Sequence, residues 1–551
     1  MALALLAALS CMIFPASAQL STFDPREATI SSTHHSLYTG LSTCRDVVSA
    51  FLSRIEALNN HTNAIIRLNP NALTIANDFD TQLKANNGSY GPLFCIPILL
   101  KDNYDTADMP TTGGNLDLAG SQPTEDAPMV QALKDAGAIV LGKANLHELA
   151  LEGLSVSSLG GQTINPYDST RTPGGSSGGT GAAIAASFAV WGTGTDTVNS
   201  LRSPASANSL FSCRPTRGLL SRTGVIPISY TQDVVGPIAR NVEDVATALT
   251  VMAKIGFDSN DNATALVPEG IRGTDYTLGL TTGSLKGLRL GLVEGFFNRA
   301  SSPETDPINE AMSNITSKLR AAGATIISIT ETLYNATSIA NLDTQRYEYR
   351  ENMNSYLQRP SLGGSHPSTL NDLYNSSSNS TFLVIPAQYE YVTAALMSST
   401  SNASYNEILR GIDDLTLSLH STFKSNDLDA LIYPQQKNLV GPIGSPSQSG
   451  RNGILAALTG TPVVTVPVGF SNATGTAPEG VPVGMEILGM EWTEEKVLGI
   501  AWQVERLGRV RSTPRWAKER VQVRGYDAVP VVVPDGGSVD VEAYPLGVLG
   551  E

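Results

Sequence analysis

The chain has 551 residues, with 36 Lys and Arg against 51 Asp and Glu, which gives a formal net charge of −15. Hydrophobic residues make up 41% and charged residues 16%, a composition typical of a globular protein and unlike that of a disordered one. Nucleic-acid binding needs a basic surface, so this charge argues against a nucleic-acid partner. The length allows one large domain or two or three smaller ones.

The N-terminus has the features of a removable secretion signal. Residues 2–14 form an apolar run that is too short to span a bilayer comfortably, and the small residues 16–18 that follow match a cleavage pattern. Lys and Arg are absent before the run, which weakens the signal, and a buried N-terminal helix is the alternative. We expect residues 1–18 to be a signal peptide, the mature chain to begin near Gln19, and no segment to span a membrane.

Asn-x-Ser/Thr sequons also favour a secreted, extracellular glycoprotein. The candidate sites for N-glycans are Asn60, Asn87, Asn262, Asn314, Asn335, Asn375, Asn379, Asn402 and Asn472. Five of them fall between residues 314 and 402, which predicts that this stretch lies largely at the surface.

Few cysteines remain once the signal is removed. They are Cys44, Cys95 and Cys213, enough for at most one disulfide, and the sequence leaves open whether one forms. Cys95 and Cys213 lie in apolar segments, which favours buried thiols for both. Metal-ligand spacings such as Cys-x-x-Cys are absent, so no metal site is expected.

Helical and strand patterns alternate along most of the chain. Apolar spacing predicts amphipathic helices over 42–58 and 127–136, and continuous apolar runs predict buried strands over 94–100 and 138–142. The same alternation returns with a helix over 307–321 and strands over 287–293, 324–329, 428–434 and 462–470. The fold class is therefore α/β, with a sheet between helices. Residues 360–405 are expected to be loops with short helices, and residues 511–551 a C-terminal tail of uncertain structure.

The segment "RTPGGSSGGTGAA" (171–183) admits several interpretations. A flexible linker is disfavoured, because an apolar helix begins directly after it inside the alternating pattern. A phosphate-binding loop would need a Lys where Thr180 stands. Residues 174–178 match the Gly-x-Ser-x-Gly elbow of α/β-hydrolases, but that site needs a downstream histidine, and both candidates lie in polar, irregular surroundings.

A lysine base is the remaining interpretation. Lys101 ends the apolar run in "CIPILLKDN", where loss of water disfavours the ammonium form. A decrease of the lysine pKa from about 10.4 to about 7 corresponds to roughly 4.6 kcal/mol. Ser200 lies in a loop between a predicted strand and a predicted helix, so the amides before it can form an oxyanion site. Ser200, Ser176 and Lys101 can then act as nucleophile, relay and base without a histidine.

Segments in a fixed order make the chain similar to the amidase signature family of serine hydrolases. They are "GPLFCIPILLKDN", "GAIVLGKANLHELA", "NPYDSTRTPGGSSGGTGAA", "GTDTVNSLRSPAS", "SCRPTRGLLSRTGVIP" and "TQDVVGPIARNVEDVA", followed by "GTPVVTVPVG" and "GVPVGMEILG". The resemblance covers residues 25–508 and is weakest between 300 and 425. It implies an amidase domain over 19–510, a large mixed central sheet with helices on both faces, no metal or organic cofactor, and a small-molecule or peptide amide as substrate.

The same resemblance assigns roles to individual residues. It implies that Ser200 is the nucleophile that forms an acyl-enzyme, that Ser176 is a relay after a cis Gly175–Ser176 peptide bond, and that Lys101 is the terminal base. The backbone amides that would form the oxyanion hole belong to Thr197, Val198, Asn199 and Ser200. The supporting residues would be Asp102, Gly175, Ser177, Asp196 and Arg202. For Ser177 the alternative is a structural hydroxyl, for Asp102 a cap at the strand end, and for Asp196 and Arg202 an ordinary ion pair.

The chain departs from the family directly before Ser200. The family usually has two glycines there, whereas this chain has Val198-Asn199. If either position requires a positive φ, Val would be strained, whereas Asn could tolerate it. The sequence thus predicts a secreted serine amidase of eukaryotic, specifically fungal, type that acts on linear amides. The alternatives are a secreted esterase with the same three residues and an inactive binding protein of the same fold.

Overall fold

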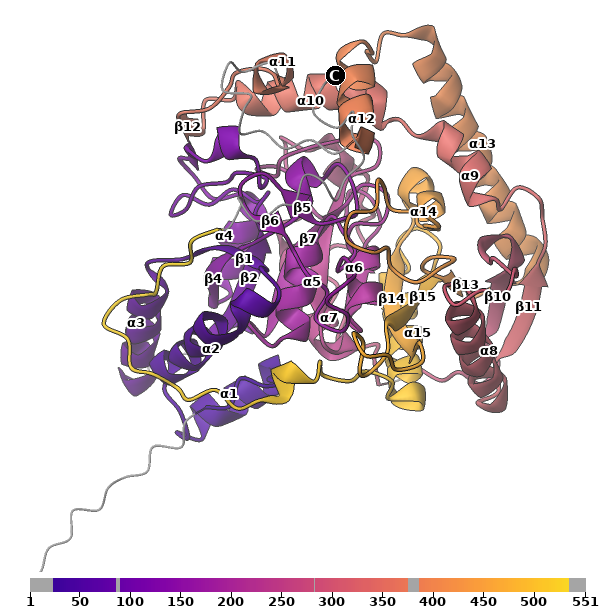
Figure 1. Cartoon of the computed structure of the whole chain (residues 1–551). Helices are drawn as coiled ribbons and strands as arrows, with labels where there is room; N and C mark the ends of the chain where they lie inside the picture. Colours follow the sequence, from indigo (N-terminus) through magenta and orange to yellow (C-terminus); the bar gives the residue numbers. More distant parts are fainter. Residues whose placement is uncertain (1–22, 86–89, 282, 375–385, 535–551) are drawn as a thin grey trace, which may run out of the picture.

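The centre of the protein is a large mixed β-sheet (Figure 1). The structure is a computed structural model that describes residues 23–85, 90–281, 283–374 and 386–534. In this part of the chain, the sheet has 11 strands in the order β1-β4-β2-β7-β9-β8-β14-β15-β13-β10-β11. The strands are β1 (Ile65–Leu68), β2 (Ile96–Lys101), β4 (Ala138–Ala144), β7 (Trp191–Asp196), β8 (Phe211–Arg214), β9 (Val234–Ala239), β10 (Arg289–Val293), β11 (Thr325–Ile329), β13 (Ala430–Pro434), β14 (Val463–Phe470) and β15 (Pro482–Leu488). The predicted α/β class with a large mixed sheet is confirmed.

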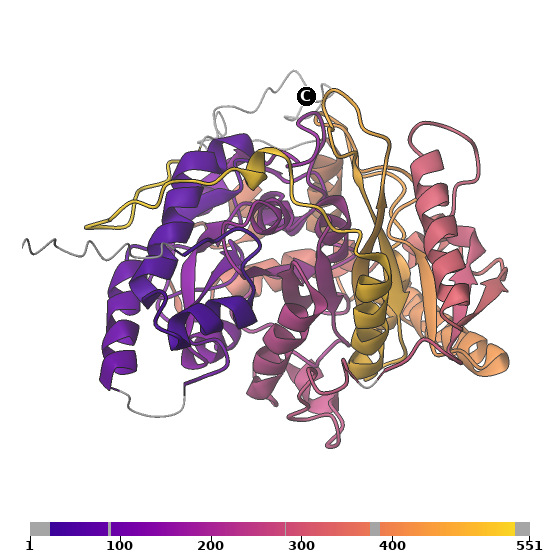
Figure 2. The ribbon, with the colours of Figure 1, turned by 90° about the horizontal axis from the view of Figure 1, so that it is seen from below.

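Helices cover this sheet and extend beyond its edges (Figures 1 and 2). They are α1 (Ile30–Tyr38), α2 (Cys44–Leu58), α3 (Ala72–Ala85), α4 (Pro128–Asp135), α5 (Gly178–Ala185), α6 (Arg202–Ala207), α7 (Val242–Met252), α8 (Asp306–Ala321), α9 (Ala336–Ile339), α10 (Gln345–Leu357), α11 (Leu370–Tyr374), α12 (Pro386–Leu396), α13 (Ala403–Asn426), α14 (Ile454–Thr459) and α15 (Glu494–Gly508). Helices α5, α7, α8 and α15 contact central strands. Two small sheets pair β12 (Leu362–Gly364) with β3 (Ser121–Pro123) and β5 (Val156–Ser157) with β6 (Gly161–Gln162).

Local chemistry explains where two of the predicted helices begin. Helix α2 starts after Thr43, whose side chain accepts from the backbone N–H of Asp46 while the Asp46 side chain accepts from that of Thr43, a capping box. Helix α4 starts with Pro128 in its first turn, and Gly137, with φ of +92°, follows its end. The segment 360–405 contains β12, α11 and α12, in line with the expectation of loops and short helices.

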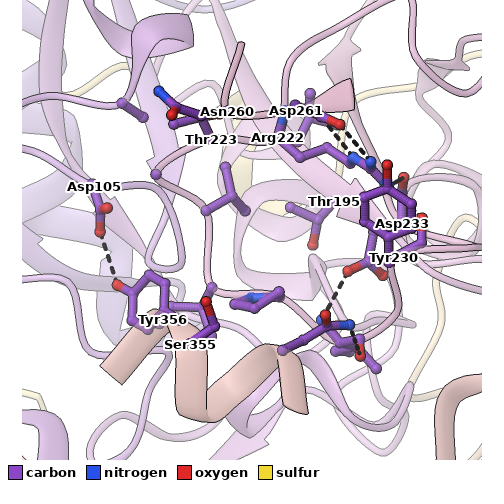
Figure 3. Close-up of a pocket in the computed structure, with 18 of the residues that line it drawn as sticks. Asp105, Thr195, Arg222, Thr223, Tyr230, Asp233, Asn260, Asp261, Ser355 and Tyr356 are labelled. Atoms are coloured by element: carbon purple, nitrogen blue, oxygen red, sulfur yellow. Dashed lines mark hydrogen bonds and ion pairs between the residues drawn. The ribbon is translucent and has the colours of Figure 1, made fainter. Parts of the chain in front are cut away.

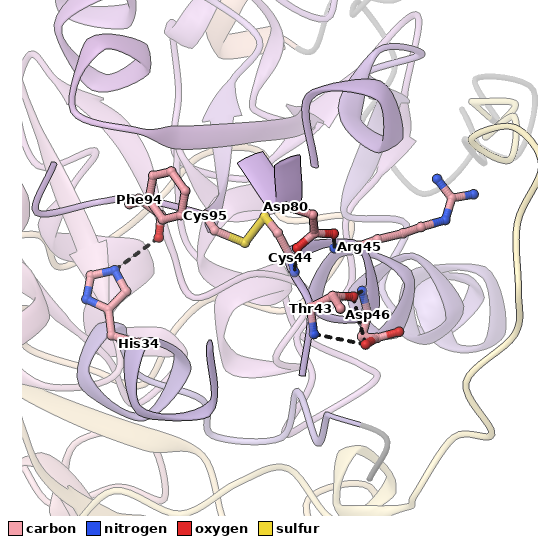
Figure 4. The surroundings of a disulfide bond; sticks show 8 residues. All are labelled: His34, Thr43, Cys44, Arg45, Asp46, Asp80, Phe94 and Cys95. Carbon is pink, nitrogen blue, oxygen red and sulfur yellow. Dashed lines mark hydrogen bonds between the residues drawn. A yellow bond between two sulfur atoms is a disulfide. The ribbon is translucent and has the colours of Figure 1, made fainter. Parts of the chain in front are cut away.

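A disulfide joins Cys44 at the start of α2 to Cys95 directly before β2 (Figure 4). The two Cα atoms are 5.8 Å apart, within the usual range for such a bond. The expectation of a buried thiol at Cys95 is therefore wrong, because the fold brings two segments 51 residues apart into contact. Cys213 is a buried free thiol, as expected, and burial raises its pKa.

The C-terminal segment 511–534 follows the surface past α1 and α2 (Figures 1 and 2). The buried side chain of Arg54, in α2, donates to the carbonyl oxygens of Ala517 and Glu519. Trp516 stacks on His61 and donates its indole N–H to the carbonyl oxygen of Pro166 at 2.9 Å. This part of the predicted tail is therefore packed onto the main domain.

The predicted signal peptide, residues 1–18, lies outside the described residues, as does the end of the tail, residues 535–551. Of the helices in the described part of the chain, none combines the length and the apolar composition that crossing a membrane requires.

Candidate active site

Lys101 lies at the carboxyl end of β2, beside the parallel strand β7. Its side chain is fully buried, and its Nζ donates to the Oγ of Ser176 and to the Oγ1 of Thr195, both at 2.7 Å. The two strands run in the same direction, so their carboxyl ends, Lys101 and Asp196, meet at one edge of the sheet. This edge is where α/β folds commonly carry their functional sites.

Burial changes the protonation of this lysine. Removal from water lowers the pKa of Lys101 to about 7, although the negative charges of Asp196 and Asp233 partly oppose the decrease. In the described part of the chain, no ion pair involves Lys101, and its two closest polar partners are hydroxyl groups. A substantial fraction of Lys101 is therefore the neutral amine near pH 7, which can accept a proton.

The glycine-rich segment brings Ser176 to Lys101 and to the turn that carries Ser200. The Gly175–Ser176 peptide bond is cis, and the carbonyl oxygen of Ser176 accepts from the N–H of His147 at 2.9 Å. The N–H of Ser177 donates to the carbonyl oxygen of Ser200 at 3.3 Å. Glycine packing also matters here, because a Cβ on Gly174, which has a positive φ, would lie 2.9 Å from a backbone oxygen of the neighbouring segment.

The turn before Ser200 exposes its amides and holds its carbonyls. The carbonyl oxygen of Val198 accepts from the guanidinium of Arg202, and that of Asn199 accepts from the N–H of Ser203 at 2.7 Å. The N–H groups of Val198, Asn199 and Ser200 have no hydrogen-bond acceptor among the described residues. Consecutive unpaired amides beside a serine can stabilise a negatively charged oxygen.

The departure at Val198-Asn199 causes no backbone strain. Positive φ values outside glycine occur at a set of described residues that includes neither position. The side-chain amide of Asn199 donates to Oε1 of Gln448 at 3.2 Å, so it is held in the protein. Gly453 packs against the turn so closely that a Cβ there would lie 2.5 Å from the carbonyl oxygen of Val198.

Asp196 anchors the same turn through buried charges. Its carboxylate accepts from Arg202 at 3.0 Å and from Arg214 at 2.7 Å, and Arg202 also pairs with Glu486 at 2.8 Å. Burial alone would raise the pKa of Asp196, but the two guanidinium groups overcome this effect and lower it to about 2. Because Arg202 also binds the carbonyl oxygen of Val198, this ion pair directly positions the turn.

Asp102 and Ser177 make structural contacts. Asp102 accepts from the Thr112 hydroxyl and from the N–H of Gly114 at 3.4 Å, and it lies 3.7 Å from the Nζ of Lys143. It therefore supports the loop after β2 and contacts neither Ser176 nor Ser200. The Ser177 hydroxyl contacts the backbone N–H and carbonyl of Thr195 at 3.3 Å, joining the start of α5 to β7.

Ser200 lines a cavity of about 540 Å³ and is 7% exposed. The cavity is lined by Ala150, Leu151, Glu152, Thr197, Val198, Asn199, Ser200, Ala340, Asn341, Asp343, Gln345, Arg346, Glu390, Tyr391, Ser447 and Arg451. Part of this wall comes from the region between 300 and 440, where the sequence resemblance is thinnest. Among the described residues, no group of three or more His, Cys, Asp or Glu side chains is arranged to hold a metal ion.

Sequence reasoning missed three residues of this site: Thr195, Asp233 and Gly453. Thr195 is near the carboxyl end of a strand parallel to the strand of Lys101, and that placement was a usable signal. Asp233 and Gly453 carry no local pattern that points to the site, since both reach it through the tertiary fold.

The Amidase family model matches residues 46–498 of the chain. A solved peptide amidase from Stenotrophomonas maltophilia has a TM-score of 0.78 and 33% identity and covers 89% of this chain and 98% of its own. A glutamyl-tRNA(Gln) amidotransferase subunit from Alkalilimnicola ehrlichii is 32% identical over 510 residues, which are 87% of this chain and 97% of that protein. A probable amidase from Arabidopsis thaliana is 30% identical and covers 90% of this chain and 93% of its own. The chain belongs to the amidase family and is a hydrolase of amides.

Proposed function

We propose that this chain cleaves carboxylic amides through an acyl-enzyme on Ser200, with Ser176 as relay and Lys101 as base. One observation carries the proposal: a fully buried lysine with a pKa of about 7 lies 2.7 Å from the Ser176 hydroxyl. A base with a pKa near the working pH is the most effective one, because it is both unprotonated and able to accept a proton.

The proton and the bonds can be followed through one turnover. Ser176 passes its proton to Lys101 and takes the proton of Ser200, whose Oγ attacks the amide carbon. The unpaired N–H groups of residues 198–200 stabilise the negative oxygen that forms. The carbon–nitrogen bond then breaks, the relay returns the proton to the departing nitrogen, and the amine leaves. Water replaces it: its hydroxyl joins the acyl carbon, its proton returns to Ser200, and the acid is released.

Intact mass after treatment with a fluorophosphonate probe tests this assignment. We expect one adduct on the parent protein, none on Ser200→Ala, and strongly slowed labelling of Lys101→Ala. Ser313→Ala, at an exposed position on α8, serves as the control and should label like the parent. An adduct that persists on Ser200→Ala would overturn the assignment of the nucleophile.

The substrate screen should include peptide amides, because the structural relative from Stenotrophomonas maltophilia is a peptide amidase. Amides and oxygen esters with the same acyl group, compared by kcat/KM, distinguish an amidase from an esterase with the same three residues. A well-folded protein that turns over neither and takes no adduct would be the inactive binding protein.

A secreted, glycosylated form is the second part of the proposal. The Cys44–Cys95 disulfide supports it, because such bonds persist mainly in oxidising compartments. The sequons in the described part of the chain are all exposed: Asn60, Asn262, Asn314, Asn335, Asn402 and Asn472. Asn87, Asn375 and Asn379 lie outside the described residues.

Expression in a secreting eukaryotic host tests the address. We expect the protein in the medium, an N-terminus near Gln19, and a loss of mass on treatment with an N-glycosidase. Under denaturing, non-reducing conditions only Cys213 should be alkylated, with Cys44 and Cys95 reacting after reduction. Retention in the cell with an intact N-terminus would contradict secretion.

A further inference from the structure

A second cavity of about 540 Å³ lies next to the first (Figure 3). The two share Ala150 and Thr197 in their walls. Ser200 lines the first cavity, whereas Thr195 lines the second, and the Thr195 hydroxyl contacts the Nζ of Lys101. The second cavity therefore lies on the side of the base.

This placement assigns one half of an amide substrate to each cavity. The acyl carbon must reach Ser200, so the acyl portion occupies the first cavity. The departing nitrogen receives its proton from the relay of Ser176 and Lys101, so the amine portion extends towards the base. Thr195 and Thr197 line the second cavity on that side.

The second cavity has apolar walls with charges set into them. Residues 225–228 and 234–235 supply apolar surface, and the ring of Tyr356 stands on the opposite side from Thr195 and Asp233 in Figure 3. Both arginines of the wall are already paired. Arg222 binds Asp261 at 2.6 Å, and Arg359 binds Asp105.

Negative charge is left over after these pairs. Asp233 accepts only from neutral groups: the Thr197 hydroxyl at 2.6 Å and the N–H groups of Ile228 and Ser229 at 2.8 and 2.9 Å. Glu125 is exposed at the wall, and in the described part of the chain neither carboxylate has an ion-pair partner. A cation entering this cavity would meet two uncompensated carboxylates.

We propose that this second cavity is an amine subsite, which binds the amine portion of an N-substituted amide when that portion is an apolar chain or ring with a positive charge. The inference rests on the acyl-enzyme function proposed above. A primary amide releases ammonia, which would leave most of this volume unused. Both the volume and the surplus charge therefore favour a larger, cationic leaving amine.

Amides that share one acyl group and differ in the leaving amine test the subsite. The amines are ammonia, n-pentylamine and 1,4-diaminobutane, the last two being nearly equal in length and differing in the terminal charge. We expect kcat/KM to increase from the primary amide to the pentyl amide and to be about tenfold higher again for the diaminobutane amide.

Two exposed wall positions separate volume from charge. Ser355→Phe narrows the cavity and should lower kcat/KM for both N-substituted amides by about tenfold relative to the primary amide. Gln358→Phe, an exposed position at the end of the same helix and outside the lining, is the matched control. Glu125→Lys should reduce the preference for diaminobutane over pentylamine by about threefold or more without changing the pentyl-to-primary ratio.

The outcomes separate this inference from the function on which it rests. Adducts at Ser200 together with equal kcat/KM for all three amides would overturn the amine subsite and leave the acyl-enzyme intact. The same holds if Ser355→Phe and Gln358→Phe behave alike. Absence of both the adduct and hydrolysis of every amide would overturn the acyl-enzyme, and the subsite with it.

Discussion

Two buried cations flank the turn that carries Ser200, and their surroundings differ. Lys101 contacts two hydroxyl groups, whereas Arg202 contacts the carboxylates of Asp196 and Glu486. Both side chains are fully buried, yet the pKa of Lys101 is lowered to about 7 and that of Arg202 is raised. Burial works against both charges, so the partner decides which cation keeps its proton.

A buried cation therefore has two distinct uses in this site. On the Arg202 side, fixed charges hold the backbone of the turn in place, because the guanidinium binds Asp196 and the carbonyl oxygen of Val198 at once. On the Lys101 side, the absence of a carboxylate partner in the described residues makes the amine available as a base. Single substitutions can alter one side at a time.

The largest effect is expected from Lys101→Met, which keeps an unbranched apolar stem and removes the amine. The rate of labelling by the fluorophosphonate probe should fall about 10³-fold, because the relay loses its proton acceptor. Thermal unfolding should show a folded protein, since a buried thioether has no charge to desolvate. A labelling rate within tenfold of the parent would mean that Lys101 is not the base.

Asp196→Asn tests the opposite side. It leaves Arg202 and Arg214 buried with one carboxylate fewer, so the free energy of unfolding should decrease by about 3 to 5 kcal/mol. Denaturant unfolding measures the change, with Glu331→Gln, at an exposed position, as the control. A decrease below about 1 kcal/mol would show that Arg202 does not depend on this carboxylate.

The pH dependence of labelling reports the protonation of Lys101 directly. The ammonium form cannot accept a proton, so the rate should increase about tenfold per pH unit up to about pH 7 and level off above pH 8. The unfolded lysine has its ordinary pKa of 10.5 and binds more protons than the native one between about pH 7 and 10.5. This group therefore makes the free energy of unfolding increase with pH across that interval. A kinetic midpoint above pH 9 would contradict the lowered pKa.

The sequence predicts one side of this comparison better than the other. Lys101 could be found because an apolar run ends in a lysine, and Ser200 because a loop follows a predicted strand. The partners of Arg202 could not: Glu486 lies 284 residues away, and no local periodicity links it to the turn. The pairing of Cys44 with Cys95 was hidden for the same reason, since contact between distant segments depends on the tertiary fold.

The smallest and most specific effect concerns Thr195, whose hydroxyl accepts from Lys101 at 2.7 Å and from Asn103 at 3.1 Å. A hydrogen bond from the ammonium to this hydroxyl favours the charged form, so Thr195→Val should lower the kinetic midpoint by up to about 1 pH unit. Thr195→Ser keeps the hydroxyl and should keep the midpoint. The fluorophosphonate probe is the suitable substrate, because it has no amine portion to contact the Thr195 side of the second cavity. Equal midpoints for the two variants would show that burial alone sets the pKa of Lys101, and the contrast with Arg202 would then rest on the carboxylates only.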